Sequence, residues 1–295
     1  MATPAPEFAV VTSSGVEAGL VLNYLLKTTS IRIKRVYVEG AGEPSKRTVS
    51  KPAPLLDRLN WHVSLAARIP RVYRWRAVSR LTGWSHLDAL SKVERLHQGL
   101  FDWLCPEARD PERAPVGRLL VPLAEVAREH QIEIVETPNI NRPESVESLR
   151  ALGPDVIIGL GTRILSPGVL ATAKRGVLNG HSAILPAYRG SVAEFWQLVG
   201  GERETGVTIH WMAPRVDSGA ICAIRRWPIP EGADHFSLRL RSLFYRLPLW
   251  QKVVGDLLLG IEHRIEQGPS PTRTFLRPTQ KELFDFYCRQ ANRRL

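Results

Sequence analysis

Short apolar runs rich in β-branched residues alternate with amphipathic segments over much of the chain. The spacing of apolar positions predicts strands at 8–12, 31–38, 133–136 and 155–160, and helices at 16–26, 119–130 and 144–152. Strands that alternate with helices favour a mostly parallel sheet with helices on both faces. We therefore expect an α/β chain with a doubly wound, mostly parallel sheet.

The alternation of strands and helices stops between residues 43 and 115. Residues 44–54 have the composition of a linker, and residues 55–104 have the pattern of helices without intervening strands. This stretch also carries four of the chain's eight tryptophans. We interpret residues 43–115 as a helical insertion in a catalytic domain formed by residues 1–42 and 116–234.

The pattern predicts further elements toward the end of the sequence. A strand is expected at 220–227, followed by a long amphipathic helix at 236–265 that is interrupted or kinked near Pro248. A short helix is expected at 282–291. Residues 235–295 are therefore interpreted as a helical C-terminal extension.

An unusual cluster of polar residues follows the apolar segment 176–178. Asn179 and His181 come at the end of this predicted strand, and side chains two residues apart on a strand point to the same side. The carboxyl ends of strands form the ligand crevice of an open α/β sheet. Farther along, the alternating segment 205–217 leads to Asp217 in a predicted tight turn.

Asn179, His181 and Asp217 suit the direct transfer of a group between two bound substrates. The sequence offers no nucleophilic cysteine or serine elbow beside them, so an acyl-enzyme triad is not indicated. An amide can donate to a developing oxyanion, while an imidazole and a carboxylate handle protons. Zinc held by His181, His210 and Asp217 is the rival interpretation, but the spacing matches no common zinc signature, so we expect no metal. His210 is instead expected to pack on its strand.

The motifs around these residues resemble those of the folate-dependent formyltransferases, and most closely the sugar-nucleotide N-formyltransferases. The family pattern is Asn-x-His, then a Leu-Pro loop, then an Asp 38 residues after the Asn, which Asn179, His181 and Asp217 match. Other matching segments are 154–158, 185–186, 188–190, 204–208 and 217–219. The resemblance implies a Rossmann-like formyltransferase fold and a catalytic trio of Asn179, His181 and Asp217.

The resemblance also implies a reaction, the transfer of a formyl group from N10-formyltetrahydrofolate to an amine. The expected acceptor is an amino sugar on a nucleotide or lipid carrier. The alternatives are another small amine, hydrolysis of the folate, or a non-catalytic protein on the same scaffold. Folate is expected to contact Leu160, Gly161, Thr162, Ile164, Leu165 and Val216. The acceptor is expected to contact Ser14, Gly15, Pro186, Tyr188, Arg189 and Gly190.

Three departures from the family pattern bear on these expectations. Ala183 stands where the family commonly has a serine, and Arg163 is an unusual addition to the folate-side loop. The tRNA enzymes of the family carry a C-terminal barrel, whereas residues 218–295 are predicted to be largely helical. We therefore do not expect tRNA, or any other nucleic acid, to be the partner.

The formal net charge of +11 lies mostly outside the segment that resembles a catalytic core. Residues 46–80 hold nine Lys and Arg against one Asp, whereas residues 116–217 hold ten basic and eleven acidic residues. The basic, tryptophan-rich segment 55–104 fits a helix on an anionic membrane surface and equally an ordinary solvated helix. The charge also fits an anionic acceptor.

The remaining features concern location and assembly. Three scattered cysteines form no disulfide framework, and the first residues lack the pattern of a secretory signal. We expect a cytoplasmic chain, with peripheral contact to the inner membrane face as a second expectation. A homodimer is the assembly that we consider.

Overall fold

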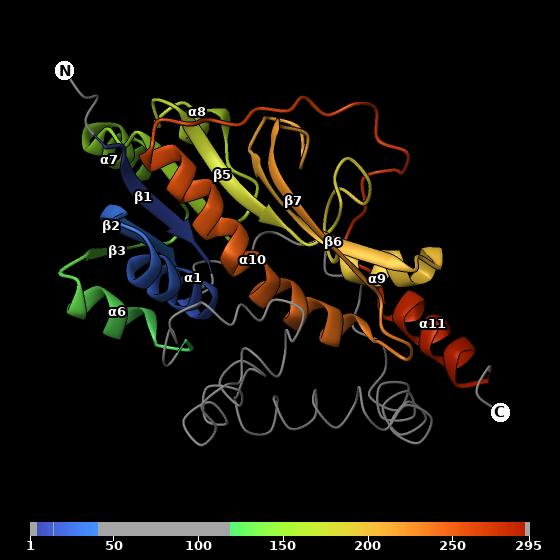
Figure 1. The fold of residues 1–295 in the computed structure, drawn as a ribbon. Helices are drawn as coiled ribbons and strands as arrows, with labels where there is room; N and C mark the ends of the chain where they lie inside the picture. Colours follow the sequence, from blue (N-terminus) through green and yellow to red (C-terminus); the bar gives the residue numbers. More distant parts are fainter. Residues whose placement is uncertain (1–4, 14, 41–118, 293–295) are drawn as a thin grey trace, which may run out of the picture.

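The computed structural model describes residues 5–13, 15–40 and 119–292 (Figure 1). The predicted insertion at 43–115 and Ser14 lie outside the described residues. The described chain forms a seven-stranded sheet with helices on both faces, made of β1 (Glu7–Thr12), β2 (Arg32–Glu39), β3 (Glu133–Thr137), β4 (Val156–Leu160), β5 (Gly176–His181), β6 (Glu204–Trp211) and β7 (Ile221–Pro228).

The order of strands across the sheet is β3-β2-β1-β4-β5-β6-β7. The first five strands in this order are mutually parallel, and β6 and β7 pair antiparallel with their neighbours. The predicted α/β class with a mostly parallel sheet is therefore confirmed. The carboxyl ends of β1, β4 and β5 lie along one edge, so polar residues that follow these strands are brought together.

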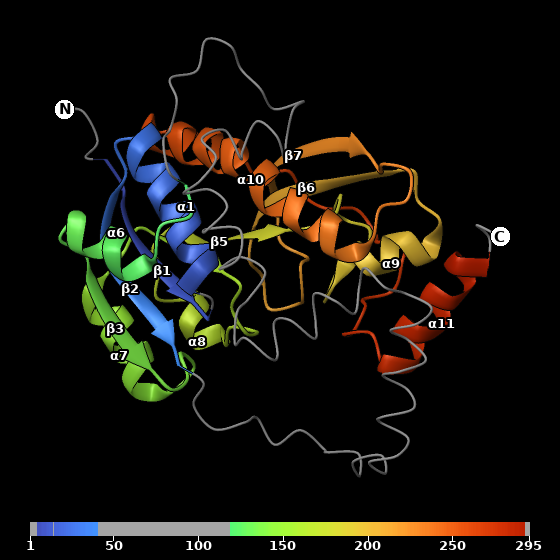
Figure 2. The same ribbon diagram turned by 90° about the horizontal axis from the view of Figure 1, so that it is seen from below.

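Alternating residues of the central strands supply two separate cores. Phe8 and Val10 of β1 join the core on one face, whereas Ala9 and Val11 join the core on the other. The first core is covered by α1 (Gly15–Thr28), α6 (Leu123–Glu129) and α10 (His235–Leu258), and the second by α7 (Pro143–Leu152) and α8 (Pro167–Leu170). Figure 2 shows α1 and α10 side by side on their face, and the two helices pack together.

A third cluster joins the last part of the chain to α9 (Ala193–Gly200) and to the loop after β5. Helix α9 contributes Phe195 and Trp196, and α11 (Gln280–Asn292) contributes Phe286 and Tyr287. The ring centroids of Phe195 and Phe286 lie 5.4 Å apart in an edge-on arrangement. The two helices therefore share a small aromatic core.

The helix predicted at 236–265 ends earlier than expected. The structure continues α10 through Pro248 but ends it at Leu258, and Gly260 follows with a φ of 78°. A glycine in this conformation stops a helix. Residues 259–279, here called the C-terminal strap, then run back across the sheet toward α11 (Figure 1). No helix of the described residues is both long and apolar enough to span a membrane.

Candidate active site

The end of β5 and the end of β6 bring three polar side chains together. In the antiparallel register, Asn179 lies opposite His210, and His181 lies opposite Thr208. The Asn179 Nδ2 atom is 3.2 Å from His210 Nε2. His210 is 1% exposed, so its ring is a fixed part of the site and not a surface group.

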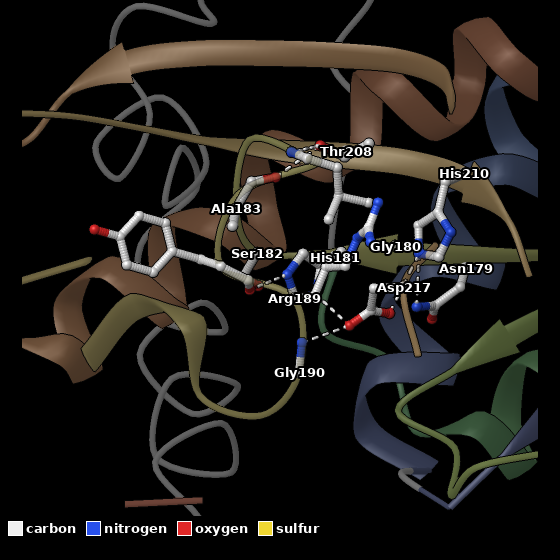
Figure 3. Close-up of polar contacts among 12 residues, drawn as sticks. Asn179, Gly180, His181, Ser182, Ala183, Arg189, Gly190, Thr208, His210 and Asp217 are labelled. Atoms are coloured by element: carbon white, nitrogen blue, oxygen red, sulfur yellow. Dashed lines mark hydrogen bonds and ion pairs between the residues drawn. The ribbon is translucent and has the colours of Figure 1, made fainter. Parts of the chain in front are cut away.

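Asp217 approaches both histidines from the turn that follows β6 (Figure 3). Its Oδ2 atom accepts a hydrogen bond of 2.8 Å from the backbone N–H of Gly190 and lies 3.5 Å from His181 Nδ1. Its Oδ1 atom lies 3.5 Å from His210 Nε2. Asp217 has a φ of 48°, a conformation that directs the turn toward the strand ends. The structure therefore brings Asn179, His181 and Asp217 to one place.

The backbone fixes which ring nitrogen of each histidine carries a proton. His181 Nε2 lies 2.8 Å from the carbonyl oxygen of Tyr188, and His210 Nδ1 lies 2.8 Å from the carbonyl oxygen of Trp211. A carbonyl only accepts, so these two nitrogens donate. The opposite nitrogens, His181 Nδ1 and His210 Nε2, are left to face Asp217. A second proton on either ring would form an ion pair with that carboxylate.

The charge state of Asp217 follows from these neighbours. Burial alone would raise the pKa of Asp217, but the charges of His181 and His210, with the N–H of Gly190, outweigh it. Together they hold the pKa of this carboxyl well below its usual range. Asp217 is therefore a carboxylate at neutral pH and can hold a proton on an adjacent imidazole.

Sequence reasoning missed two residues that fix the β5 end. His210 was expected to pack on its strand, whereas it contacts both Asn179 and Asp217. Buried Arg246 of α10 donates from Nη1 to the Gly180 carbonyl at 2.7 Å. A Cβ atom on Gly180 would lie 3.0 Å from Arg246 Cδ, so a larger residue there would require the Arg246 side chain to shift. Only the pairing register could have revealed His210, and no sequence signal marked Arg246.

A cavity of about 330 Å³ opens beside these residues. Asn179, His181 and Asp217 line it, and so do five of the predicted folate-side residues, namely Gly161, Thr162, Ile164, Leu165 and Val216. Leu160, the sixth, is 1% exposed and belongs to the core instead. Ile164 is 70% exposed, which leaves an apolar surface for a flat ring. The volume lies at the lower end of the range for small-molecule sites.

The residues predicted to bind the acceptor divide into two groups. Gly190 lines the cavity, and Gly15 begins α1, from which Glu17 also lines it. Pro186, Tyr188 and Arg189 are not among the lining residues, because they hold the C-terminal strap. The strap hydroxyls of Ser270 and Thr272 bond the backbone of Pro186 and Tyr188, respectively.

The C-terminal strap also braces the Asp217 turn. Arg189 Nη2 donates to Gln267 Oε1 at 2.6 Å, and Gln267 Nε2 donates to the carbonyls of Asp217 and Gly219 at 3.0 and 2.6 Å. Phe275 pairs with Gly190 through the backbone, and its ring stacks on Tyr188 and Trp196 at 5.5 and 4.9 Å between centroids. The strap is thus built into the site.

The structure gives a local setting for Ala183 and Arg163, the two side chains that depart from the family pattern. Ala183 is fully buried, and its carbonyl accepts a hydrogen bond of 2.7 Å from Thr208 Oγ1. A hydroxyl is therefore still present, but it comes from β6. Arg163 forms an ion pair of 2.6 Å with Glu39, a buried carboxylate at the end of β2. The described residues include no group of His, Cys, Asp and Glu arranged to hold a metal ion.

Sequence comparison places these residues in a known family. The model of the Formyl transferase family matches residues 112–244, which include Asn179, His181 and Asp217. This part of the chain therefore matches a formyl transferase domain. Curated relatives include a methionyl-tRNA formyltransferase of Rhodopirellula baltica, 35% identical over 149 residues, and one of Geobacter sulfurreducens, 37% identical over 159 residues. These matches cover 50% and 53% of this chain, but only 44% and 50% of the relatives, so the chain spans about half of their length.

Solved structures of formyltransferases share the fold. Glycinamide ribonucleotide transformylase 1 of Symbiobacterium toebii superposes with a TM-score of 0.54 at 17% identity, covering 89% of this chain and 93% of the other. An N-formyltransferase of Helicobacter canadensis, solved with folinic acid and dTDP-3-aminofucose, gives a TM-score of 0.53 at 16% identity, covering 95% and 79%. At such identities the likeness concerns the fold alone.

Proposed function

We propose that this formyl transferase chain is an enzyme that moves a formyl group from N10-formyltetrahydrofolate to an amine. The observation that carries the proposal is the meeting of Asn179, His181 and ionised Asp217 at one cavity. The family match over residues 112–244 supports the same reaction. Neither described cysteine lines the cavity, and Cys222 is further disfavoured as an acyl-enzyme nucleophile because burial raises the pKa of its thiol to about 12.

The folate supplies a formyl group on N10; the acceptor nitrogen bonds to the formyl carbon, the bond to N10 breaks, and the amine proton ends on N10. The Asn179 amide, oriented by His210, donates a hydrogen bond to the oxygen on which charge develops. His181 holds a proton on Nδ1 beside Asp217, and the resulting positive charge stabilises that oxygen. Asp217 keeps this proton in place.

The folate side of the cavity is assigned to the loop after β4. Gly161, which has no side chain, brings backbone groups to the cavity, Thr162 lines it as well, and Ile164 offers an exposed apolar side chain. Val216 faces the cavity from the segment before Asp217. Backbone polar groups beside apolar side chains suit a flat heterocycle with many hydrogen-bonding atoms. These residues therefore fit a folate, and no metal is required for the proposed steps.

Two acceptors are supported by different observations. The motif resemblance favours an amino sugar on a nucleotide or lipid carrier, and the Helicobacter canadensis enzyme, which has the same fold, was solved with such a sugar, dTDP-3-aminofucose. The curated relatives are methionyl-tRNA formyltransferases, which makes methionyl-tRNA the second candidate, although the chain spans only about half of their length. Contact of residues 55–104 with a membrane stays a prediction from sequence alone.

An acceptor screen tests the proposal. Purified protein is mixed with N10-formyltetrahydrofolate and, separately, with dTDP-3-aminofucose, an amino sugar on a lipid carrier, glycinamide ribonucleotide and methionyl-tRNA. Formylated product is measured by mass spectrometry. We expect Asn179→Ala and Asp217→Ala each to lower kcat by about a hundredfold or more, with half-buried Asp285→Ala, on α11 and outside the cavity lining, as the control. Turnover unchanged in both active-site variants would contradict the proposal.

A further inference from the structure

A buried carboxylate in the cavity has no role in the steps above. Glu194 stands in the first turn of α9, lines the same cavity as Asn179 and Asp217, and is only 4% exposed. Two other carboxylates line this cavity within the described residues. Asp217 faces the two histidines, and Glu17 lies 3.2 Å from Arg246.

The side chain of Glu194 makes no hydrogen bond or ion pair with any described residue. Three side-chain polar atoms of the described residues are fully enclosed and have no hydrogen-bond partner, namely Trp227 Nε1, Trp250 Nε1 and Ser242 Oγ. The Glu194 oxygens are not among them, so they are not fully enclosed. The carboxylate therefore keeps its small accessible area on the cavity. A charge taken out of water without a partner is costly, so native proteins pair such groups.

The arginines that line the cavity do not supply this partner. Arg163 and Arg246 are each paired with another carboxylate, and exposed Arg239 forms no ion pair with Glu194. The first turn of a helix favours a negative charge, but that contribution is modest. What Glu194 lacks is a set of hydrogen-bond donors, and the space in front of it is the cavity where the acceptor must enter.

We propose that Glu194 binds the acceptor through donor groups next to the reacting nitrogen, and that the acceptor is consequently a hydroxylated amine of the amino-sugar class. This inference rests on the proposed function. An ionised carboxylate accepts hydrogen bonds from an ammonium or from a pair of hydroxyls, and such charge-assisted bonds are the strong ones. Glu194 acts as a binding residue and takes no part in the chemical step.

The chain offers a matched control in Glu144. Both glutamates are the second residue of a helix, α9 and α7, and neither has a partner among the described residues, but Glu144 is exposed. Glu144→Gln therefore removes the same favourable interaction between an acidic side chain and the start of a helix, but at an exposed position. Comparing Glu194→Gln with Glu144→Gln isolates the buried, cavity-facing part of the effect.

The test uses thermal unfolding of the whole chain with and without D-glucosamine at about 50 mM, and needs no turnover. We expect Glu194→Gln alone to raise Tm by about 2–4 °C, because an unpaired buried charge is removed, while Glu144→Gln does not. D-Glucosamine should stabilise the wild type and Glu144→Gln, and the shift should fall at least about threefold in Glu194→Gln. D-Glucose in parallel separates binding through hydroxyls from binding through the ammonium.

A lowered Tm for Glu194→Gln, or equal glucosamine shifts in all three proteins, including no shift in any, would overturn the inference. The acceptor screen tests formyl transfer separately. If the screen finds no product while the glucosamine shift depends on Glu194, the amine site stands and the proposed reaction fails. If the screen finds formylated amino sugar but Glu194→Gln leaves the KM for the amino sugar unchanged, the proposed reaction stands and the role of Glu194 is wrong.

Discussion

Replacement of His210 by leucine tests whether the second imidazole orients the site. Leucine has a similar volume and no polar atom. The change removes the hydrogen bond of 2.8 Å that His210 Nδ1 donates to the Trp211 carbonyl. It also removes His210 Nε2, which lies 3.2 Å from the Asn179 amide nitrogen. Asp217 keeps two other contacts, with His181 and with the Gly190 N–H. The effect should therefore fall mainly on Asn179.

The magnitudes follow from these contacts. Each buried partner left unpaired costs about 1–3 kcal/mol, so two partners predict a loss of about 2–6 kcal/mol. For a chain of this size that corresponds to a fall in Tm of about 5–18 °C. Removing an oxyanion donor outright costs about 10²–10³ in turnover, and misdirecting Asn179 is a partial loss. We expect kcat to fall by about 10–100-fold in His210→Leu.

The assay is steady-state formylation with both substrates varied, together with thermal unfolding. Exposed His130→Leu is the matched control, because it removes an imidazole that touches neither Asn179 nor Asp217. His210→Gln, whose amide can still hydrogen-bond, should recover part of kcat. If His210→Leu keeps kcat within about threefold of wild type while Tm falls as predicted, His210 only stabilises the fold, and the reasoning about Asn179 is refuted.

Three further predictions concern other parts of the site. The lowered pKa of Asp217 adds stability above about pH 4 that is lost at lower pH, so the Tm difference between wild type and Asp217→Asn should shrink below about pH 4; a constant difference from pH 7 to pH 3 contradicts this. Gly190→Ala should lower Tm by several degrees and make the C-terminal strap protease-sensitive, because a Cβ would overlap the Phe275 backbone; intact resistance to limited proteolysis contradicts it. With its pKa near 12, buried Cys222 should react with iodoacetamide at pH 8 about a hundredfold slower than half-buried Cys288, as measured by peptide mass spectrometry; equal rates contradict it.

Apolar periodicity predicted the core elements because burial on both faces leaves a clear pattern. In β1, Phe8 and Val10 go to one core and Ala9 and Val11 to the other, which reads as a short continuous apolar run. The same logic failed after α10. Leu259 is 77% exposed in the strap, so its apolar character extended a helical pattern that Gly260 stops.

The trio of Asn179, His181 and Asp217 could be predicted because strand alternation and motif spacing are local. His210 could not, because its place depends on the antiparallel pairing of β5 with β6. The register sets Asn179 opposite His210, and a shift of one residue would turn the imidazole to the other face of the sheet. A contact that depends on the pairing register cannot be predicted from the sequence of either strand alone.

The C-terminal strap changes how the predicted extension is understood. Gln267 holds the carbonyls of Asp217 and Gly219, while Phe275 is paired with Gly190, whose N–H donates to the Asp217 carboxylate. Both ends of the Asp217 turn are thus held by residues beyond 244, where the family match ends. Tyr188 and Arg189, predicted to touch the acceptor, are committed to this bracing. The position of the Asp217 carboxylate beside the two histidines therefore depends on a segment outside the matched region, so changes in that segment would alter the site even where the trio itself is kept.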